Sequence, residues 1–161
     1  MKNIILFVFC FNFLSLVSCQ NTTERISEEM EPENKEGAVV REVTVSGSEN
    51  AYQFSVTIES PDTGCEQYAD WWEVFSESGD LIYRRILGHS HVDEQPFTRS
   101  GGPVNVESQQ IVYIRAHMNP LGYGTKLFHG NVKDGFVPME VITDLAADLE
   151  TKQPLPTNCA F

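Results

Sequence analysis

The sequence predicts an all-β domain, an antiparallel β-sandwich of about seven strands. Apolar and polar side chains alternate over several short segments, which is the pattern of strands with one face on a core. Turn-forming residues separate these segments, and little of the chain has a helical pattern. The 161 residues are 41% hydrophobic, which is ordinary for one globular core.

The N-terminal segment has the pattern of an export signal. Lys2 supplies a positive charge, and residues 4–16 form an apolar run that is too short to span a bilayer as a stable helix. The run ends in the tetrapeptide Leu16-Val17-Ser18-Cys19. This motif resembles the lipobox of bacterial lipoproteins, in which the cysteine is lipidated and becomes the mature N-terminus. The resemblance implies a signal peptide at residues 1–18 and a lipid on Cys19.

The same resemblance implies an address. The domain is expected to be exported and tethered to a membrane of the cell envelope by acyl chains such as palmitate. No later segment has enough consecutive apolar residues to cross a membrane, so we expect the lipid on Cys19 to be the only anchor. Gln20 follows the cysteine where Asp would favour retention, so onward sorting to an outer membrane is expected.

Residues 19–37 are expected to form an acidic, disordered linker. Residues 20–36 contain six glutamates against Arg25 and Lys35, and they have almost no apolar side chains to bury. The whole chain has a formal charge of −12, which argues against nucleic-acid binding through a positive surface. The folded domain is therefore expected over residues 38–161, and residues 81–133 are locally basic.

Two strands are predicted at the start of the domain. Residues 39–45 are rich in β-branched side chains and end at a turn-prone cluster. Residues 52–58 alternate without error, and the apolar side chains are Tyr52, Phe54, Val56 and Ile58.

A third strand follows, with Trp72 and Val74 assigned to the core. A buried tryptophan early in the third strand resembles immunoglobulin-like and fibronectin-like sandwiches. Trp71 has the opposite parity, so it either forms a carbohydrate-stacking platform or is covered by a loop or the C-terminal tail. Residues 78–80 make a hairpin turn into a return strand at residues 81–87.

The remaining elements follow in order. Pro96 and the run at residues 100–103 are expected to break regular structure, with a short strand after them. Strands are predicted at residues 111–118 and 125–132, and a short helix at residues 143–150. In the strand at 111–118 the inward side chains are expected to be Val112, Ile114, Ala116 and Met118.

Four cysteines have different expected fates. Cys10 lies within the signal and Cys19 carries the lipid, which leaves Cys65 and Cys159. In an oxidising envelope compartment two remaining thiols most simply form a disulfide. A redox pair or metal ligands are the alternatives, although neither cysteine has Cys-x-x-Cys spacing.

The histidines suggest a copper or zinc site. His89 and His91 have the spacing that places both imidazoles on one face of an extended strand. His117 or His129 could supply a third ligand. Asp93 and Glu94 follow in the same segment. Each could bind the metal or could orient a ligating histidine.

A second hypothesis is an exposed binding surface. Tyrosine and arginine are favoured at binding hot spots, and a locally basic patch could select an envelope protein or an anionic glycan. The expected members, on the outward parity of two strands, are Tyr83, Arg85, Tyr113 and Arg115, joined by His89, His91 and His117. The alternative is that these side chains only form cross-strand pairs.

Known catalytic patterns do not fit. The spacing around His89 and His91 differs from the first motif of the cupin family, and the chain lacks the Gly-x-Ser-x-Gly elbow of hydrolases. The sequence therefore predicts a lipid-anchored envelope protein with a non-catalytic binding or assembly domain and no cofactor. A copper- or zinc-binding protein is the alternative.

Overall fold

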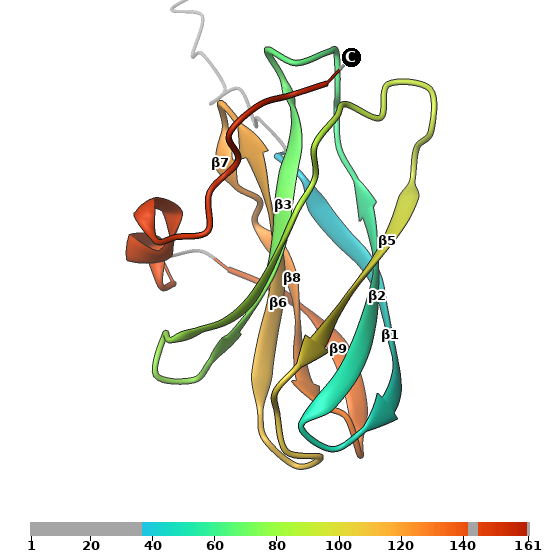
Figure 1. Cartoon of the computed structure of the whole chain (residues 1–161), viewed down its shortest axis with the longest axis vertical. Helices are drawn as coiled ribbons and strands as arrows, with labels where there is room; N and C mark the ends of the chain where they lie inside the picture. The colour runs from blue at the N-terminus through green and yellow to red at the C-terminus, as the bar shows by residue number, and fades with distance from the viewer. Residues whose placement is uncertain (1–36, 142–144, 161) are drawn as a thin grey trace, which may run out of the picture. The chain divides into compact units, whose positions relative to one another are not determined.

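The computed structural model describes residues 37–141 and 145–160. This part of the chain forms two antiparallel sheets that pack face to face, so the predicted β-sandwich is confirmed (Figure 1). The smaller sheet has the order β1-β2-β5, with strands Val39–Ser48, Ala51–Glu59 and Phe97–Val104. The larger sheet has the order β4-β3-β6-β8-β9, and a short β7 pairs with β6. Its strands in chain order are β3 Tyr68–Ser76, β4 Leu81–Ile86, β6 Val112–Asn119, β7 Gly122–Tyr123, β8 Lys126–Asn131 and β9 Gly135–Glu140.

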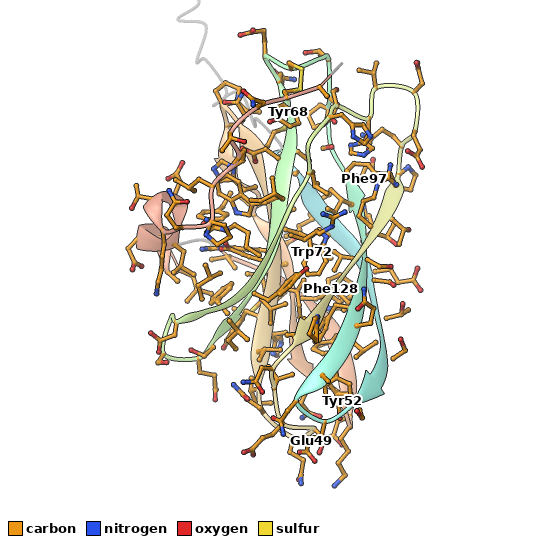
Figure 2. The ribbon with its side chains drawn as sticks, viewed as in Figure 1. Glu49, Tyr52, Tyr68, Trp72, Phe97 and Phe128 are labelled. Carbon is orange, nitrogen blue, oxygen red and sulfur yellow. A yellow bond between two sulfur atoms is a disulfide. The ribbon has the colours of Figure 1, made fainter. Side chains whose placement is uncertain are left out.

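The core lies between the two sheets and contains the side chains that alternation assigned to it. Trp72 and Val74 on β3 are fully buried, and Figure 2 shows Trp72 between the sheets. The other predicted inward residues of β2 and β6 are also buried; they are Tyr52, Phe54, Val56, Ile58, Val112, Ile114, Ala116 and Met118. Burying a side chain of this size typically contributes about 1.5–3 kcal/mol, so this cluster is the main source of stability.

The predicted facing of β4 was wrong. Arg85 pairs with Trp72 and Tyr83 pairs with Val74, and directly opposed residues of an antiparallel pair share a face. Tyr83 and Arg85 therefore face the smaller sheet, where Arg85 Nε donates to the Ser100 carbonyl at 3.3 Å. Alternation within this short strand gave no signal to choose between the two faces.

The glycine-rich run at residues 100–103 was expected to break regular structure. It lies instead within β5. A Cβ on Gly101 would lie 2.7 Å from Tyr83 Oη and 2.9 Å from Trp72 Cζ2. On Gly102 it would lie 2.6 Å from the Tyr52 carbonyl oxygen. The two glycines thus serve close packing against neighbouring strands, and are not there to make a turn.

Three further elements differ from expectation. Residues 122–123 form β7 between the strands predicted at residues 111–118 and 125–132, and neither β7 nor β9 was predicted. Instead of a helix at residues 143–150, the structure has one 3-10 turn, Ala147–Thr151; Thr143 and Asp144 lie outside the described residues. The described strands therefore number nine, where about seven were expected.

No helix within the described residues is long and apolar enough to cross a membrane.

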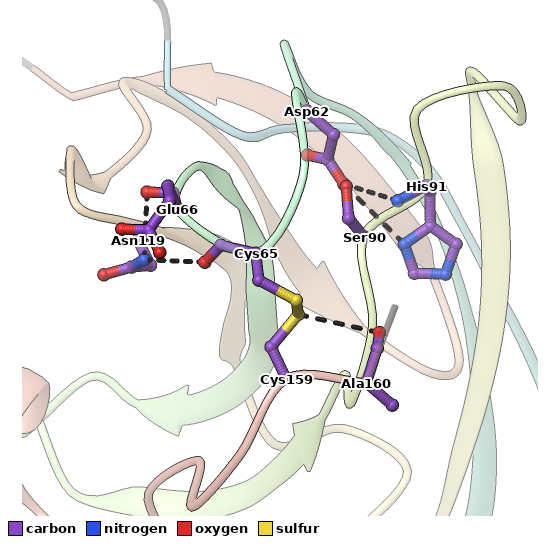
Figure 3. The surroundings of a disulfide bond; sticks show 8 residues. All are labelled: Asp62, Cys65, Glu66, Ser90, His91, Asn119, Cys159 and Ala160. Carbon is purple, nitrogen blue, oxygen red and sulfur yellow. Dashed lines mark hydrogen bonds and ion pairs between the residues drawn. A yellow bond between two sulfur atoms is a disulfide. The ribbon is translucent and has the colours of Figure 1, made fainter.

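The predicted disulfide is confirmed. Cys65 and Cys159 are bonded, with their Cα atoms 5.6 Å apart and a sequence separation of 94 (Figure 3). Residues 145–160, which we call the C-terminal strap, cross the outer face of the larger sheet before reaching this bond. The disulfide therefore ties the end of the strap to the loop before β3.

Candidate functional site

Two regions bring chemically active side chains together: the outer face of the larger sheet, and a loop beside the disulfide. On the outer face, Glu73 of β3 lies between Arg84 of β4 and Arg115 of β6 because both arginines pair with it across the sheet. The carboxylate is 0% exposed. Arg84 Nη2 donates to it at 2.5 Å and Arg115 Nε donates at 2.8 Å. A buried carboxylate is thus paired with two guanidinium groups.

The same two arginines bind the backbone of the C-terminal strap. Both side chains have donors left after pairing with Glu73, and a guanidinium can donate in several directions at once. Arg84 donates to the carbonyls of Leu149, Lys152 and Pro154, and Arg115 to those of Leu145 and Ala146. The network therefore fixes the strap over the sheet, and it occupies the guanidinium donors of both residues.

Aromatic rings complete this covered face. Trp71 is 3% exposed and stacks on His117 with ring centroids 3.6 Å apart. The Arg84 guanidinium lies 4.5 Å from the Trp71 ring centre, and the Arg115 guanidinium lies 3.3 Å from that of Tyr123. Burial, and then the negative charge of Glu73, raise the pKa of the Tyr123 hydroxyl well above its usual range. Trp71 is therefore covered and is not an open stacking platform.

His117 is also committed to this face. Its Nδ1 lies 2.6 Å from Asp70 Oδ1, and its Nε2 lies 3.3 Å from Glu150 Oε1 in the strap. His129, on β8, stacks instead on Tyr113 with ring centroids 5.9 Å apart. Each of these two histidines thus has neighbours of its own on the larger sheet.

The predicted binding surface is not assembled as expected. Arg115 has the expected parity, but it is 3% exposed beneath the strap. Tyr113 shares this outer face, whereas Tyr83 and Arg85 face the smaller sheet. The strands β4 and β6 are not neighbours, because β3 lies between them. The four residues therefore do not form one exposed patch.

The second region is the loop between β4 and β5, which we call the histidine loop (residues 88–96). It lines an open hollow of about 460 Å³. The hollow is lined by His89, Ser90, His91, Val92, Asp93 and Glu94, together with Ala160 of the strap. The backbone of Ala160 donates to the Gly88 carbonyl at 2.7 Å, so the strap forms one wall of this hollow.

His91 is the central side chain of the loop. It is 3% exposed, stacks on Phe97 with ring centroids 3.7 Å apart, and lies 4.4 Å from the His89 ring centre. Neither of its ring nitrogens has a hydrogen-bond partner within the described residues. Burial, with the positive charges of Arg99 and His89, lowers the pKa of His91 below its ordinary value. The ring is therefore held as a neutral imidazole near neutral pH.

Asp62 holds the loop in place from behind. Its buried carboxylate accepts hydrogen bonds from the Ser60 hydroxyl at 2.6 Å and the Ala69 amide at 2.9 Å. It also accepts one from the His91 amide at 2.8 Å, which Figure 3 shows. The His91 Nδ1 atom lies 3.8 Å from the same carboxylate. Asp62 thus links β3 to the histidine loop and faces one nitrogen of the ring.

The structure brings together only part of the expected metal site. His89 and His91 lie side by side, and Asp93 and Glu94 line the same hollow, but His117 contacts Asp70 and Glu150 elsewhere. Within the described residues, no group of three or more His, Cys, Asp or Glu side chains is placed to hold a metal ion. Glu94 is bound instead by Arg99 Nη2 at 2.7 Å.

Sequence reasoning did not identify the central roles of Glu73 and Asp62. One signal was available for Glu73: it is the single carboxylate between aromatic side chains of the same parity in β3. No comparable signal marked Asp62, because two of its three partners, Ala69 and His91, come from other segments that the fold brings to it.

Comparison with known proteins points to a lipoprotein. No protein-family model and no solved structure matches the chain. A protein of Halomicrobium mukohataei named "Putative lipoprotein" is 39% identical over 98 residues, which is 61% of this chain and 48% of that protein. The chain thus spans about half the length of this relative. The match supports the assignment of this chain as a lipoprotein.

Proposed function

We propose that the protein is a lipoprotein anchored to the cell envelope through Cys19, and that its β-sandwich is a non-catalytic binding or assembly module. The lipobox-like Leu16–Cys19 motif and the relative named as a lipoprotein support the anchor. The open hollow in the histidine loop is the observation that carries the binding role. Sorting to an outer membrane, which Gln20 favours, belongs to the same proposal.

The histidine loop is the part of the domain suited to meet a partner. Val92 is 45% exposed and lines the hollow, so the loop presents an apolar side chain to solvent beside an open depression. The anchored domain would meet other envelope proteins, and we propose one of these as the partner. An anionic glycan is less well matched, because Arg115 pairs internally with Glu73 and the hollow carries Asp93 and Glu94.

The anchor is tested by phase partition of the full chain in Triton X-114, expressed in a host that lipidates such proteins. The wild-type protein is expected in the detergent phase, and a Cys19→Ala variant in the aqueous phase or as an uncleaved precursor. Cys10→Ala is the matched control and is expected to behave as wild type. Equal partition of wild type and Cys19→Ala would contradict the lipid anchor.

The contact is tested by placing a photoreactive amino acid at position 92 and irradiating intact cells. Position 137 is the matched control, because Val137 of β9 is 54% exposed and lies outside the histidine loop. A discrete protein adduct from position 92 and none from position 137 is the expected result. The same adducts from both positions, or none from position 92, would contradict a contact through this loop.

A further inference from the structure

We propose that the hollow of the histidine loop is a site for a divalent transition-metal ion of the zinc and copper class, bound through the imidazoles of His89 and His91. This inference goes beyond the envelope contact proposed above. It starts from His91, whose two ring nitrogens have no hydrogen-bond partner among the residues that the structure describes.

The buried imidazole of His91 needs a partner. Both ring nitrogens are buried and have no hydrogen-bond partner within the described residues, although the ring lines an open hollow. A buried polar atom without a partner costs about 1–3 kcal/mol, and such groups in native proteins usually have a specific reason. A metal ion on one nitrogen would satisfy that atom directly, since neutral imidazole is a common ligand for zinc and copper.

The surroundings of the ring match those of a metal-binding histidine. Nδ1 lies 3.8 Å from the Asp62 carboxylate, which is fixed by hydrogen bonds from Ser60 and Ala69. Ligating histidines usually donate their other N–H to a carboxylate, which fixes the ring and raises its basicity. If Nδ1 moves slightly closer to the carboxylate, Asp62 can accept a hydrogen bond from it and orient the ring in this way. Nε2 is then the ligating atom.

His89 is placed as the second ligand. Its ring centre lies 4.4 Å from that of His91, and His89 is exposed and lines the hollow. Asp93 and Glu94 give the hollow a negative charge, which favours a cation over an anionic ligand. Two imidazole nitrogens select zinc or copper over calcium and magnesium, which prefer oxygen ligands.

The site is open, because the described residues do not supply a preassembled third ligand. Coordination is completed by solvent, or by Asp93, which lies in the exposed part of the same loop. An open two-histidine site binds less tightly than a closed structural site, and we expect dissociation constants of about micromolar.

The test is a titration of the full-length protein with Zn²⁺ by calorimetry and with Cu²⁺ by electron paramagnetic resonance. One ion per chain is expected, and the Cu²⁺ spectrum should show coupling to two nitrogens. In His89→Ala the affinity should fall at least about tenfold and the coupling should drop to one nitrogen. His89 is exposed, so this variant should fold; its circular dichroism spectrum checks this.

His129→Ala is the matched control. His129 contacts Tyr113 on the larger sheet, so this substitution should leave metal binding unchanged. Absence of saturable binding tighter than about 100 µM by wild type would overturn the proposal, as would equal binding by wild type and His89→Ala. Photocrosslinking from position 92 is independent of metal, so failure of the metal site leaves the test of the envelope contact unchanged.

Discussion

Replacing Glu73 by Gln is expected to be the most damaging polar substitution on the outer face of the larger sheet. The carboxylate is 0% exposed and is paired with both Arg84 and Arg115. Glu73→Gln would leave two buried guanidinium groups without their counter-ion. Breaking a buried ion pair in this way costs about 3–5 kcal/mol. Because the glutamine carbonyl keeps one acceptor, we expect a loss near the lower end, about 3 kcal/mol.

A matched change on the surface isolates the effect of burial. Glu59 pairs with Arg41 at 2.6 Å, but the two side chains are 50% and 42% exposed. Exposed pairs of this kind contribute about 0–1 kcal/mol. Glu59→Gln removes the same charge from an equally short pair, so its effect should be smaller by about 2 kcal/mol or more.

Urea unfolding followed by tryptophan fluorescence measures both variants. Trp71 and Trp72 are the two tryptophans of the sequence and precede Glu73 on β3, so they report on this part of the sheet. A domain of this size has a free energy of unfolding of about 5–15 kcal/mol, so a loss of 3 kcal/mol is readily measured. If Glu73→Gln costs no more than Glu59→Gln, the buried network does not stabilise the strap as we argue.

Three further predictions follow from packing, the disulfide and the buried histidine. Gly101→Ala should cost about 1–3 kcal/mol in the same unfolding assay, because its Cβ would overlap the side chains of Trp72 and Tyr83. Removing the Cys65–Cys159 bond by replacing both cysteines with Ala should cost up to about 4–5 kcal/mol, because the closed loop is long. In metal-free protein, burial keeps the pKa of His91 below its ordinary 6.5, so the unfolded chain binds more protons in that range. Stability should therefore fall as the pH drops below about 6.5, and His91→Gln should flatten this dependence.

Each of these has an outcome that would refute it. Gly88→Ala is the control for Gly101→Ala, since a Cβ on Gly88 has no atom within 4 Å; equal effects would refute the packing argument. Wild-type stability in the double cysteine variant under oxidising conditions would show that the bond adds nothing to the native fold. A pH dependence that persists unchanged in His91→Gln would assign it to another group.

Much of the fold could be predicted because the core strands alternate cleanly. Apolar side chains occupy alternate positions in residues 52–58 and 111–118. The inward side chains of both segments were therefore assigned correctly. The strands that were missed lack this signal. Gly101 and Gly102 look like a turn in sequence, but they pack against neighbouring strands of the sandwich. That requirement depends on atoms of Tyr52, Tyr83 and Trp72, which alternation within one segment does not reveal.

The candidate site was harder to predict, because parity assigns a face without showing what covers it. Arg115 and His117 do lie on the outer face, but the C-terminal strap covers them, and β3 separates β6 from β4. Strand order and the path of a tail are tertiary features. His89 and His91 do lie side by side, but in the loop after β4 and not on one face of an extended strand, as their spacing suggested.

Intact mass spectrometry of the protein purified from the cell envelope without reducing agent tests whether Cys19 carries a lipid. We expect a chain that begins at Cys19, carries the added mass of acyl chains, and is two hydrogens lighter than the reduced form because of the Cys65–Cys159 bond. A mature chain that begins elsewhere, or one that begins at Cys19 without acyl mass, would refute the lipid anchor.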